Sequence, residues 1–477
     1  MTSDLRYASH STPHGGADFL GHPRGLSYLF ATEMWERFSY FGNAALVVLY
    51  MVKYLLEPGR VEAVIGYGAV KGALEALFGP LDPQPFASQL FGFYTGLAYS
   101  MPILGGLIAD RALGQRRTVL IGGVLMACGH FMMAFELLFL FALLMLILGI
   151  GAFKPNVSTQ VGDLYPPGDP RRDRAYSIFY VGINIGALLA PLVCGSVAVA
   201  FGWHMGFAAA GIAMLISIAI YVRGLRWLTA DRVSAQRMEP HATHPLNPQQ
   251  RGAVIALILV CGFVSLFWAA YDQQGNTIVL WAEDFTERSI DLVIWRGEIP
   301  TTWFLALNPL MIFVFTPLVV RLWTWQSKRG SEPFSIRKMA FGCLMVALAN
   351  LIMAGAAWTA PAGGKVSPLW LIGYFGLATI GELFLAPVGL ALISKVAPAG
   401  MLSMIMGVWF AATLPGDILA GWLGGFWMTI TKTDFFLLIA GVAALAGAAI
   451  WAISGWLASI LDVKAEMYST SSTRPKV

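Results

Sequence analysis

Long apolar stretches fill most of this chain, and short polar segments separate them. Each stretch has about the 20 residues that a helix needs to cross the hydrocarbon layer of a membrane. The pattern therefore predicts an all-α membrane protein with twelve membrane-spanning helices. We place these spans at residues 27–53, 86–110, 117–135, 137–160, 174–200, 203–224, 252–281, 301–324, 336–358, 368–394, 403–428 and 434–461.

One polar segment divides the predicted spans into two groups of six. Residues 225–250 form the most polar interior stretch and lie near the midpoint of the chain. Basic loops follow the second span (Asp110 to Arg117) and the eighth span (Arg321 to Gly330), which are equivalent places in the two groups. We therefore predict duplicated halves that rock around a central site. The predicted order is a tail at 1–26, six-helix bundles at 27–224 and 251–462 with the linker 225–250 between them, and a tail at 463–477.

Composition supports the membrane assignment and narrows the range of partners. The 477 residues are 57% hydrophobic and 12% charged, with a mean hydropathy of +0.66, which excludes a soluble domain and a disordered chain. The net charge of +4 is small, and the basic residues follow the membrane topology, so nucleic acid is not an expected partner. The four cysteines lie within apolar spans and none is paired with another by short spacing, which predicts packing roles and no metal site.

Basic residues concentrate in the loops on one side of the predicted membrane. If the first tail is cytoplasmic, the cytoplasmic segments contain clusters such as Arg116 with Arg117 and Arg171 with Arg172, and the outer loops contain far fewer. Short cytoplasmic loops carry the excess of Lys and Arg in membrane proteins. We therefore expect both termini in the cytoplasm. In the outer loop 55–85, residues 60–79 have helix-like apolar spacing and predict a helical extension or an interfacial helix.

The first span contains three charges that a lipid-facing helix would exclude. Glu33, Glu36, Arg37 and Tyr40 recur at i, i+3, i+4 and i+7, which places them on one face of a helix. Three charges at the centre of a span disfavour insertion by roughly 7 to 10 kcal/mol. One interpretation is a structural ion pair between Glu36 and Arg37. A third charge favours proton coupling instead, because one carboxylate is left to be neutralised by a proton.

Three further charges lie alone in apolar spans and are candidates for a functional site. They are Lys154, Asp272 and Glu382. Lys154 could alternatively extend to the membrane interface, as long basic side chains do. Together with Arg37, these residues place positive charge in the first half and negative charge in the second, a pattern that suits a zwitterion such as a short peptide. Aromatic residues could supply side-chain pockets, although single aromatics more often serve packing; the candidates are Tyr40, Phe41, Tyr99, Trp303 and Trp409.

These motifs resemble the proton-dependent oligopeptide transporter family of the major facilitator superfamily. The likeness runs from about residue 27 to about residue 430. Five stretches carry it: ExxERFSYFG from Glu33, GGLIADRALGQRR from Gly105, FKPNVS from Phe153, YSIFYVGINIGAL from Tyr176 and GELFLAPVG from Gly381. The resemblance implies twelve helices in two six-helix bundles and inward symport of di- and tripeptides with protons by alternating access.

The resemblance also implies roles for particular residues and surroundings. It assigns proton coupling to Glu33, Glu36, Arg37 and Asp272, and substrate binding to Arg37, Tyr40, Tyr99, Lys154, Asn184, Trp303, Asn308, Glu382 and Trp409. Among these, Arg37 and Lys154 would lie near the peptide carboxylate, and Asn184, Asn308 and Glu382 would receive the amino end. It further implies no cofactor other than protons as the coupling ion, a monomer, and a place in the bacterial cytoplasmic membrane.

Three departures from the family pattern stand out. Phe41 replaces the second tyrosine of the usual first-helix motif and removes one hydroxyl. Ala44 stands where many relatives carry a second arginine, so Asp272 lacks its expected counter-ion. The linker 225–250 is too short for the two extra helices that many bacterial relatives insert there.

These departures keep other functions open. One is a transporter of the same fold for a non-peptide anion or an amino-acid-like solute. Another is a receptor that binds a ligand without transporting it. An enzyme is not expected, because the sequence contains no nucleophile with a base, no metal cluster and no glycine-rich phosphate loop.

Overall fold

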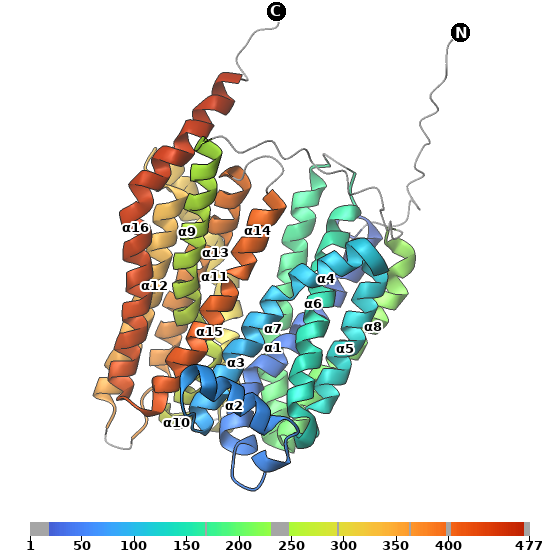
Figure 1. Cartoon of the computed structure of the whole chain (residues 1–477), viewed down its shortest axis with the longest axis vertical. Coiled ribbons are helices and arrows are strands. Elements are labelled where there is room, and N and C mark those ends of the chain that lie inside the picture. Colours follow the sequence, from blue (N-terminus) through green and yellow to red (C-terminus); the bar gives the residue numbers. More distant parts are fainter. Residues whose placement is uncertain are drawn as a thin grey trace, which may run out of the picture.

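The computed structural model describes residues 19–166, 169–229, 248–292, 295–361, 364–396 and 402–471. Most of the predicted linker, residues 230–247, lies outside this part of the chain, as do residues 1–18 and 472–477 of the predicted tails. Within it, the chain folds into two groups of packed helices that stand side by side (Figure 1). The polypeptide enters α1 and leaves α16 on the same side of the molecule (Figure 1).

The first half starts with α1, three residues before its predicted beginning. Its elements are α1 (Arg24–Tyr50), a π-helical turn (Met51–Leu55), a 3-10 turn (Val61–Ala63), α2 (Tyr67–Phe78), α3 (Pro83–Ser100), α4 (Pro102–Ile108), a second π-helical turn (Ala109–Leu113), α5 (Gln115–Met132), a 3-10 turn (Glu136–Leu138), α6 (Phe139–Asp163), α7 (Arg171–Phe201), α8 (Trp203–Gly224) and a 3-10 turn (Leu225–Trp227). Pro102 separates α3 from α4, because proline has no N–H group to continue the helical hydrogen bonds. As the apolar spacing of residues 60–79 predicts, the outer loop forms a helix, α2.

The second half contains helices and one short hairpin. Its elements are α9 (Pro248–Tyr271), the 3-10 helix η6 (Asp272–Gly275), α10 (Thr277–Phe285), β1 (Ser289–Leu292), β2 (Trp295–Glu298), the 3-10 helix η7 (Thr301–Ala306), α11 (Leu307–Lys328), α12 (Ser335–Thr359), α13 (Leu369–Val396), α14 (Leu402–Ala411), α15 (Thr413–Gly424), the 3-10 helix η8 (Gly425–Met428) and α16 (Lys432–Ser471). The antiparallel hairpin pairs Ser289 with Glu298 and Leu292 with Trp295. α16 continues past Asp462, where the predicted bundle ends.

Ten helices in the described part of the chain are long and apolar enough to cross a membrane. The predicted spans 117–135 and 403–428 are not among them. The first corresponds to α5, which begins with the polar residues Gln115, Arg116 and Arg117, and the second is interrupted near Ala412 between α14 and α15. Twelve crossings therefore stay a prediction.

The helix packing of the first half is repeated in the second. α1 packs against α7 and α8, and α9 packs in the same way against α15 and α16. α5 contacts α6 and α8, as α12 contacts α13 and α16. This repetition fits the duplication that the two basic loops predict.

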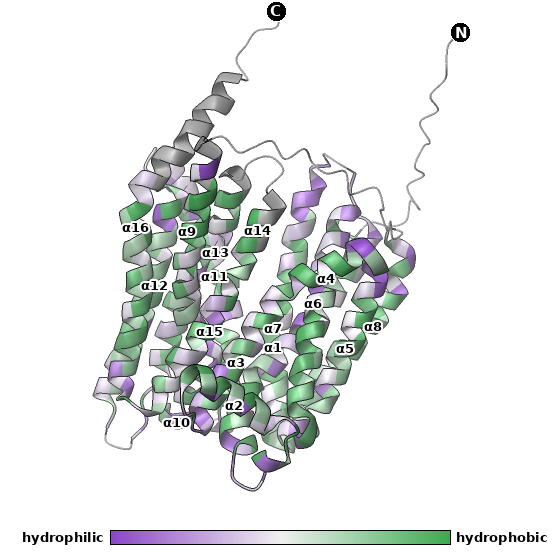
Figure 2. Ribbon diagram, in the orientation of Figure 1, coloured by the Kyte–Doolittle hydropathy of each residue, from purple (hydrophilic) through white to green (hydrophobic). Residues whose placement is uncertain are grey.

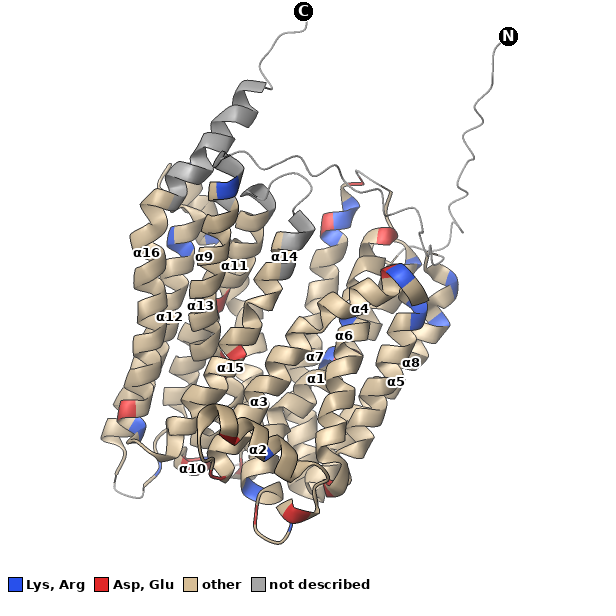
Figure 3. Cartoon of the chain, viewed as in Figure 1, with Lys and Arg blue, Asp and Glu red and all other residues tan. Residues whose placement is uncertain are grey.

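Apolar side chains cover the outer faces of both halves. Large exposed hydrophobic residues include Leu104, Ile212, Val314 and Trp358, each of which is at least 52% exposed. Apolar residues run along the middle of the helices (Figure 2), and Lys, Arg, Asp and Glu gather mainly at the two ends (Figure 3). A surface of this kind faces lipid, because water would not solvate it.

The halves contact each other at the end of the molecule that carries α2. A Cβ atom at Gly92 on α3 would lie 3.1 Å from the Gly421 Cα on α15, so the absence of side chains lets these helices touch. Ser88 on α3 donates a hydrogen bond to Asn276 across the same contact (2.7 Å). On the other flank, the Thr302 hydroxyl donates to the Pro191 carbonyl on α7 (2.9 Å). If both termini are cytoplasmic, the outer side of the protein is the closed one.

Candidate functional site

The charged stripe of α1 folds into one buried cluster. The Arg37 guanidinium donates two hydrogen bonds to the Glu36 carboxylate, at 2.5 and 2.6 Å. Glu33 lies 3.5 Å from the Arg37 Nε, and its second oxygen, Oε2, has no hydrogen-bond partner among the described residues. All three side chains are at most 3% exposed. The cluster thus contains one arginine and two carboxylates, as the spacing predicts.

Close helix packing explains how α1 holds these charges away from lipid. α7 crosses α1 at Gly186, where a Cβ would come within 2.3 Å of the Met34 carbonyl oxygen. Gly182 likewise faces Phe30, because a Cβ there would lie 2.9 Å from its ring. The two glycines allow the helix backbones to approach closely. The charged face of α1 is therefore covered by protein.

Lys154 on α6 lies beside this cluster. Its Nζ atom is 4.3 Å from the ring centre of Tyr99 on α3, and the Arg37 guanidinium lies 5.0 Å from the Tyr40 ring centre. The rings of Tyr40 and Tyr99 contact each other edge to face at 6.1 Å. Lys154 thus points toward a neighbouring helix, which disagrees with the alternative of an amine extended to the membrane interface. Lys154 forms no ion pair with any described carboxylate, unlike Arg37.

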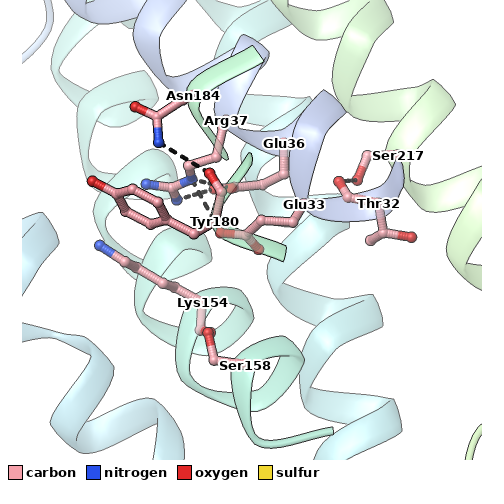
Figure 4. Close-up of polar contacts among 9 residues, drawn as sticks. All are labelled: Thr32, Glu33, Glu36, Arg37, Lys154, Ser158, Tyr180, Asn184 and Ser217. Atoms are coloured by element: carbon pink, nitrogen blue, oxygen red, sulfur yellow. Dashed lines mark hydrogen bonds and ion pairs between the residues drawn. The ribbon is translucent and has the colours of Figure 1, made fainter. Parts of the chain in front are cut away.

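α7 adds residues from a third helix. The Asn184 amide donates to the Tyr180 carbonyl oxygen at 3.0 Å and is buried. The polar ends of Arg37, Lys154 and Tyr180 point in the same direction (Figure 4). The Tyr180 phenol lies within electrostatic range of Glu382 in the other half. Tyr180 was not among the predicted site residues, although it stands in the motif from Tyr176.

A second cluster surrounds Glu382 on α13. The Tyr271 hydroxyl donates to the Glu382 Oε2 at 2.5 Å, and the Asn308 amide donates to the same oxygen at 3.0 Å. Asn308 also reaches the Thr379 hydroxyl at 3.1 Å. Only neutral groups therefore bind this carboxylate in the described structure. The sequence analysis predicted that Asn308 and Glu382 belong to one group, and the structure places them in contact. It did not predict Tyr271 or Thr379. Asn184, which it assigned to the same group, is not hydrogen-bonded to this cluster in the described structure.

Asp272 stands apart from both clusters, at the start of η6. η6 packs against α15, which carries Asp417, a residue that is 2% exposed and whose Oδ2 atom has no hydrogen-bond partner among the described residues. Asp417 was not predicted. It could have been, because it is an acidic residue inside an apolar span, as Asp272 is.

The two predicted tryptophans occupy different surroundings. The Trp303 indole nitrogen donates to the Leu192 carbonyl (3.1 Å) and to the Ser196 hydroxyl (3.0 Å), and so connects the two halves. Trp409 is 4% exposed and packs against Gly389, where a Cβ would lie 2.0 Å from the indole. Neither contact involves the charged clusters. Among the described residues, no group of three or more His, Cys, Asp or Glu side chains could hold a metal ion.

Comparison with known proteins decides the family. The sequence model of the POT family matches residues 116–246 and 231–436. The peptide transporter YePEPT of Yersinia enterocolitica is 34% identical over 486 residues, which cover 87% of this chain and 90% of that protein. The chain belongs to the POT family. A di-/tripeptide transporter of Lactococcus lactis subsp. cremoris, 29% identical over 90% of this chain and 94% of its own length, is a further relative.

Solved structures of POT transporters have the same fold. The crystal structure of peptide transporter POT in complex with sulfate aligns with a TM-score of 0.80 at 29% identity and covers 93% of this chain and 97% of that one. A POT family transporter in complex with 5-aminolevulinic acid aligns with a TM-score of 0.76 at 26% identity, over 92% and 98% of the two chains. This POT member is therefore a multi-pass membrane protein with the major facilitator fold, in a family of transporters.

Proposed function

We propose that this POT protein imports di- and tripeptides together with protons, by alternating access of a site between its halves. In this proposal the protein is a transporter and not an enzyme, and protons are its only coupling ion. It acts as a monomer in the bacterial inner membrane, with both termini in the cytoplasm.

The observation that carries the proposal is the placement of unlike charges on facing halves. Lys154, in the first half, forms no ion pair with a described carboxylate and so can bind the carboxylate of a peptide. Glu382, in the second half, is held by the neutral groups of Tyr271 and Asn308 and can receive the peptide's ammonium. Tyr180 lies near both Glu382 and the Arg37 cluster, which supports a shared site.

The α1 cluster supplies the groups for proton coupling. The Arg37 guanidinium keeps its positive charge, and the carboxylates of Glu33 and Glu36 both interact with it. A proton that binds one carboxylate frees part of the guanidinium for another anion. The unpartnered oxygen of Glu33 is a position where such a proton would bind without breaking a hydrogen bond.

Uptake into proteoliposomes tests this function. With acid outside and labelled Ala-Ala offered, label should accumulate against its gradient, and a protonophore should abolish the accumulation. Uptake that ignores the proton gradient would refute the coupling. Binding without translocation would favour a receptor.

The same assay tests a second candidate substrate class, amino-acid-like solutes. A solved POT relative binds 5-aminolevulinic acid, and Phe41 and Ala44 change the first helix of this chain. An amino-acid-like solute also carries both charges. Transport of 5-aminolevulinic acid without transport of any peptide would favour this alternative.

A further inference from the structure

The connection between α11 and α12 concentrates positive charge at one end of the second half. Residues 321–338 contain five Lys or Arg residues and one acidic residue, Glu332. Glu332 pairs with Lys338 at 2.5 Å. Arg329 and Arg337 are exposed, and neither forms an ion pair with a carboxylate of the described residues. The proposed peptide site uses neither arginine, so their charge remains available to an anion outside the protein.

An exposed tryptophan lies against each of these two arginines. The Arg329 guanidinium carbon is 4.0 Å from the Trp325 ring centre, and the Arg337 guanidinium carbon is 5.5 Å from the Trp451 ring centre on α16. Trp325 is 48% exposed and Trp451 is 54% exposed. A cation over the face of an indole ring is attracted by the electrons of the ring. The ring holds the guanidinium in place, and the N–H groups at its edge can still donate to an anion.

Trp451 lies close to the depth at which the hydrocarbon layer of a membrane ends. The apolar part of α16 that could cross a membrane runs from Lys432 to Trp456. Trp451 follows Lys432 by 19 residues, or about 28 Å along a helix, and the hydrocarbon layer is about 30 Å thick. α16 leaves the molecule on the side of the termini (Figure 1). The two arginine–tryptophan pairs therefore lie near the lipid headgroups on that side, where tryptophan is enriched in membrane proteins.

Lys338 holds the connection against the end of α11. Its Nζ atom lies 4.2 Å from the Trp323 ring centre on α11, in addition to the ion pair with Glu332. Lys338 is only 7% exposed, so these contacts are shielded from water. They fix the first turn of α12, which carries Arg337, beside the last turns of α11, after which Arg329 follows. Both arginines are thus presented at the same end of the second half.

The equivalent loop of the first half is arranged differently. There, Arg116 donates to the carbonyl oxygens of Leu228 and Thr229, at 2.6 and 3.0 Å. Arg171 pairs with Asp169 at 2.8 Å. These guanidinium groups connect parts of the protein to one another. A basic loop therefore does not by itself direct its arginines outward, and the arrangement at the end of α11 is a particular feature of the second half.

We propose that Arg329 with Trp325 and Arg337 with Trp451 form a surface that binds the headgroup of an anionic phospholipid. The lipid phosphate accepts hydrogen bonds from the guanidinium groups. A lipid fits this surface better than a soluble anion does, because the exposed tryptophans and Phe334, which is 56% exposed, lie where acyl chains begin. The inference names a partner of the second half and goes beyond the proposed transport.

Native mass spectrometry of the detergent-purified full chain tests this proposal. Titration with phosphatidylglycerol and with zwitterionic phosphatidylcholine gives the Kd of the first bound lipid of each kind. Phosphatidylglycerol should bind more tightly. The double variant Arg329→Gln with Arg337→Gln should raise the Kd for phosphatidylglycerol about 30-fold, since each basic residue near an anionic lipid contributes about fivefold. Its Kd for phosphatidylcholine should stay unchanged.

The matched control is Arg117→Gln with Arg223→Gln. Both arginines are exposed, at the start of α5 and in the last turn of α8 in the first half. This variant loses the same charge and should keep the Kd of the unsubstituted protein. Trp325→Leu retains all charges and should raise the Kd for phosphatidylglycerol about 2- to 5-fold, because Arg329 loses the ring that holds it. Thermal melting without lipid confirms that each variant is folded.

Four outcomes would overturn the proposal. They are equal Kd values for the two lipids, an unchanged Kd in the Arg329 and Arg337 variant, an equal loss in the control variant, and displacement of the lipid by inorganic phosphate, which would indicate a site for a soluble anion. The measurement contains no peptide and no proton gradient. A failure of the proposed transport function would therefore be seen separately, as absent peptide uptake by the unsubstituted protein.

Discussion

At the scale of single residues, the two carboxylates around Arg37 are held differently. Glu36 accepts two hydrogen bonds from the guanidinium, whereas Glu33 makes one longer ion pair. We predict that Glu36→Gln abolishes gradient-driven uptake and leaves peptide exchange partly intact, because glutamine keeps a hydrogen bond to Arg37 but cannot carry a proton. Counterflow and proton-driven uptake in the same proteoliposomes measure the two activities.

The matched control for Glu36 is Glu57→Gln. Glu57 is 53% exposed and pairs with Arg60 in the outer loop, so its loss should change neither activity. Accumulation at the unsubstituted level by the Glu36 variant would remove this residue from the coupling mechanism.

The charges of Lys154 and Glu382 should determine how strongly the substrate binds. A hydrogen bond to a charged group contributes about 1.5–3 kcal/mol, so Lys154→Gln or Glu382→Gln should raise the KM for Ala-Ala by roughly 10- to 150-fold. Lys328→Gln, an exposed lysine at the end of α11, is the control for the lost charge. Unchanged KM in both site variants would contradict a peptide held between unlike charges.

Tyr271 offers a prediction that the sequence did not suggest. Its hydroxyl donates to Glu382 and accepts from Asn308. Tyr271→Phe should raise the KM by about 5- to 30-fold, the effect of about 1–2 kcal/mol, because Glu382 loses a donor that orients it. Tyr374→Phe is a matched control in the same half, since the Tyr374 hydroxyl has no partner among the described residues. Equal KM values for the two variants would exclude a positioning role for Tyr271.

The difference between these residues shows what a sequence can predict about the site. The α1 stripe is local, and helix periodicity alone places Glu33, Glu36 and Arg37 together. Tyr271 at the end of α9 contacts Glu382 on α13 and Asn308 on α11. A local sequence pattern does not indicate which helices lie next to each other, so these contacts could not be predicted. Asp417 was missed for another reason: it is an acidic residue inside an apolar span, a signal that the sequence carries and that was overlooked.

At the scale of elements, α3 and α15 form the contact between the halves at the end that carries α2, which is the outer end if both termini are cytoplasmic. The prediction concerns Gly92, which has no space for a side chain against Asp417 and Gly421. Gly92→Ala should leave insertion and thermal stability of the detergent-purified protein nearly unchanged but reduce uptake at least about tenfold, because the clash of 2.3 Å exists only in the closed state. Gly262→Ala on α9, where nothing lies within 4 Å, should retain full uptake.

Gly105→Ala separates closure from folding in that experiment. A Cβ at Gly105 on α4 would meet the Gly151 carbonyl of α6 at 1.9 Å, within one half. This variant should lower thermal stability as well as uptake. If Gly92→Ala lowers thermal stability as much as Gly105→Ala does, the α3–α15 contact is structural and does not report closure.

Element ends and interruptions were less predictable than the elements themselves. Apolar length predicts the spans to within a few residues for α1, α6 and α8. The π-helical turn at Met51–Leu55 contains no proline or glycine, whereas Pro415 follows the interruption near Ala412 by three residues. Pro415 has no N–H group to donate to the Ala411 carbonyl, so the sequence could have predicted this interruption. The π-helical turn has no such local signal.

At the scale of the whole molecule, an ion pair joins the halves at the end that carries α2. Lys53, just after α1, lies 2.6 Å from Asp284 on α10, and each side chain is 37% exposed. An exposed pair contributes about 0.2–1 kcal/mol, so it can shift the balance between closed and open only by up to about fivefold. Glycine contacts and buried hydrogen bonds therefore dominate closure, and the ion pair adjusts it.

Charge reversal tests this small contribution. Lys53→Asp should lower the closed fraction by up to about tenfold, because attraction is replaced by repulsion between like charges. Double electron–electron resonance between spin labels at Leu77→Cys on α2 and Met428→Cys in η8, both exposed positions, measures this fraction. Adding Asp284→Lys should restore it, since the pair is then reversed and not removed. At about 1 M salt, where charges more than about 3 Å apart are screened, the single variant should approach the unsubstituted protein. A loss that persists in high salt and in the double variant would mean that Lys53 holds the halves through packing of its alkyl chain, and the electrostatic account of this contact would have to be abandoned.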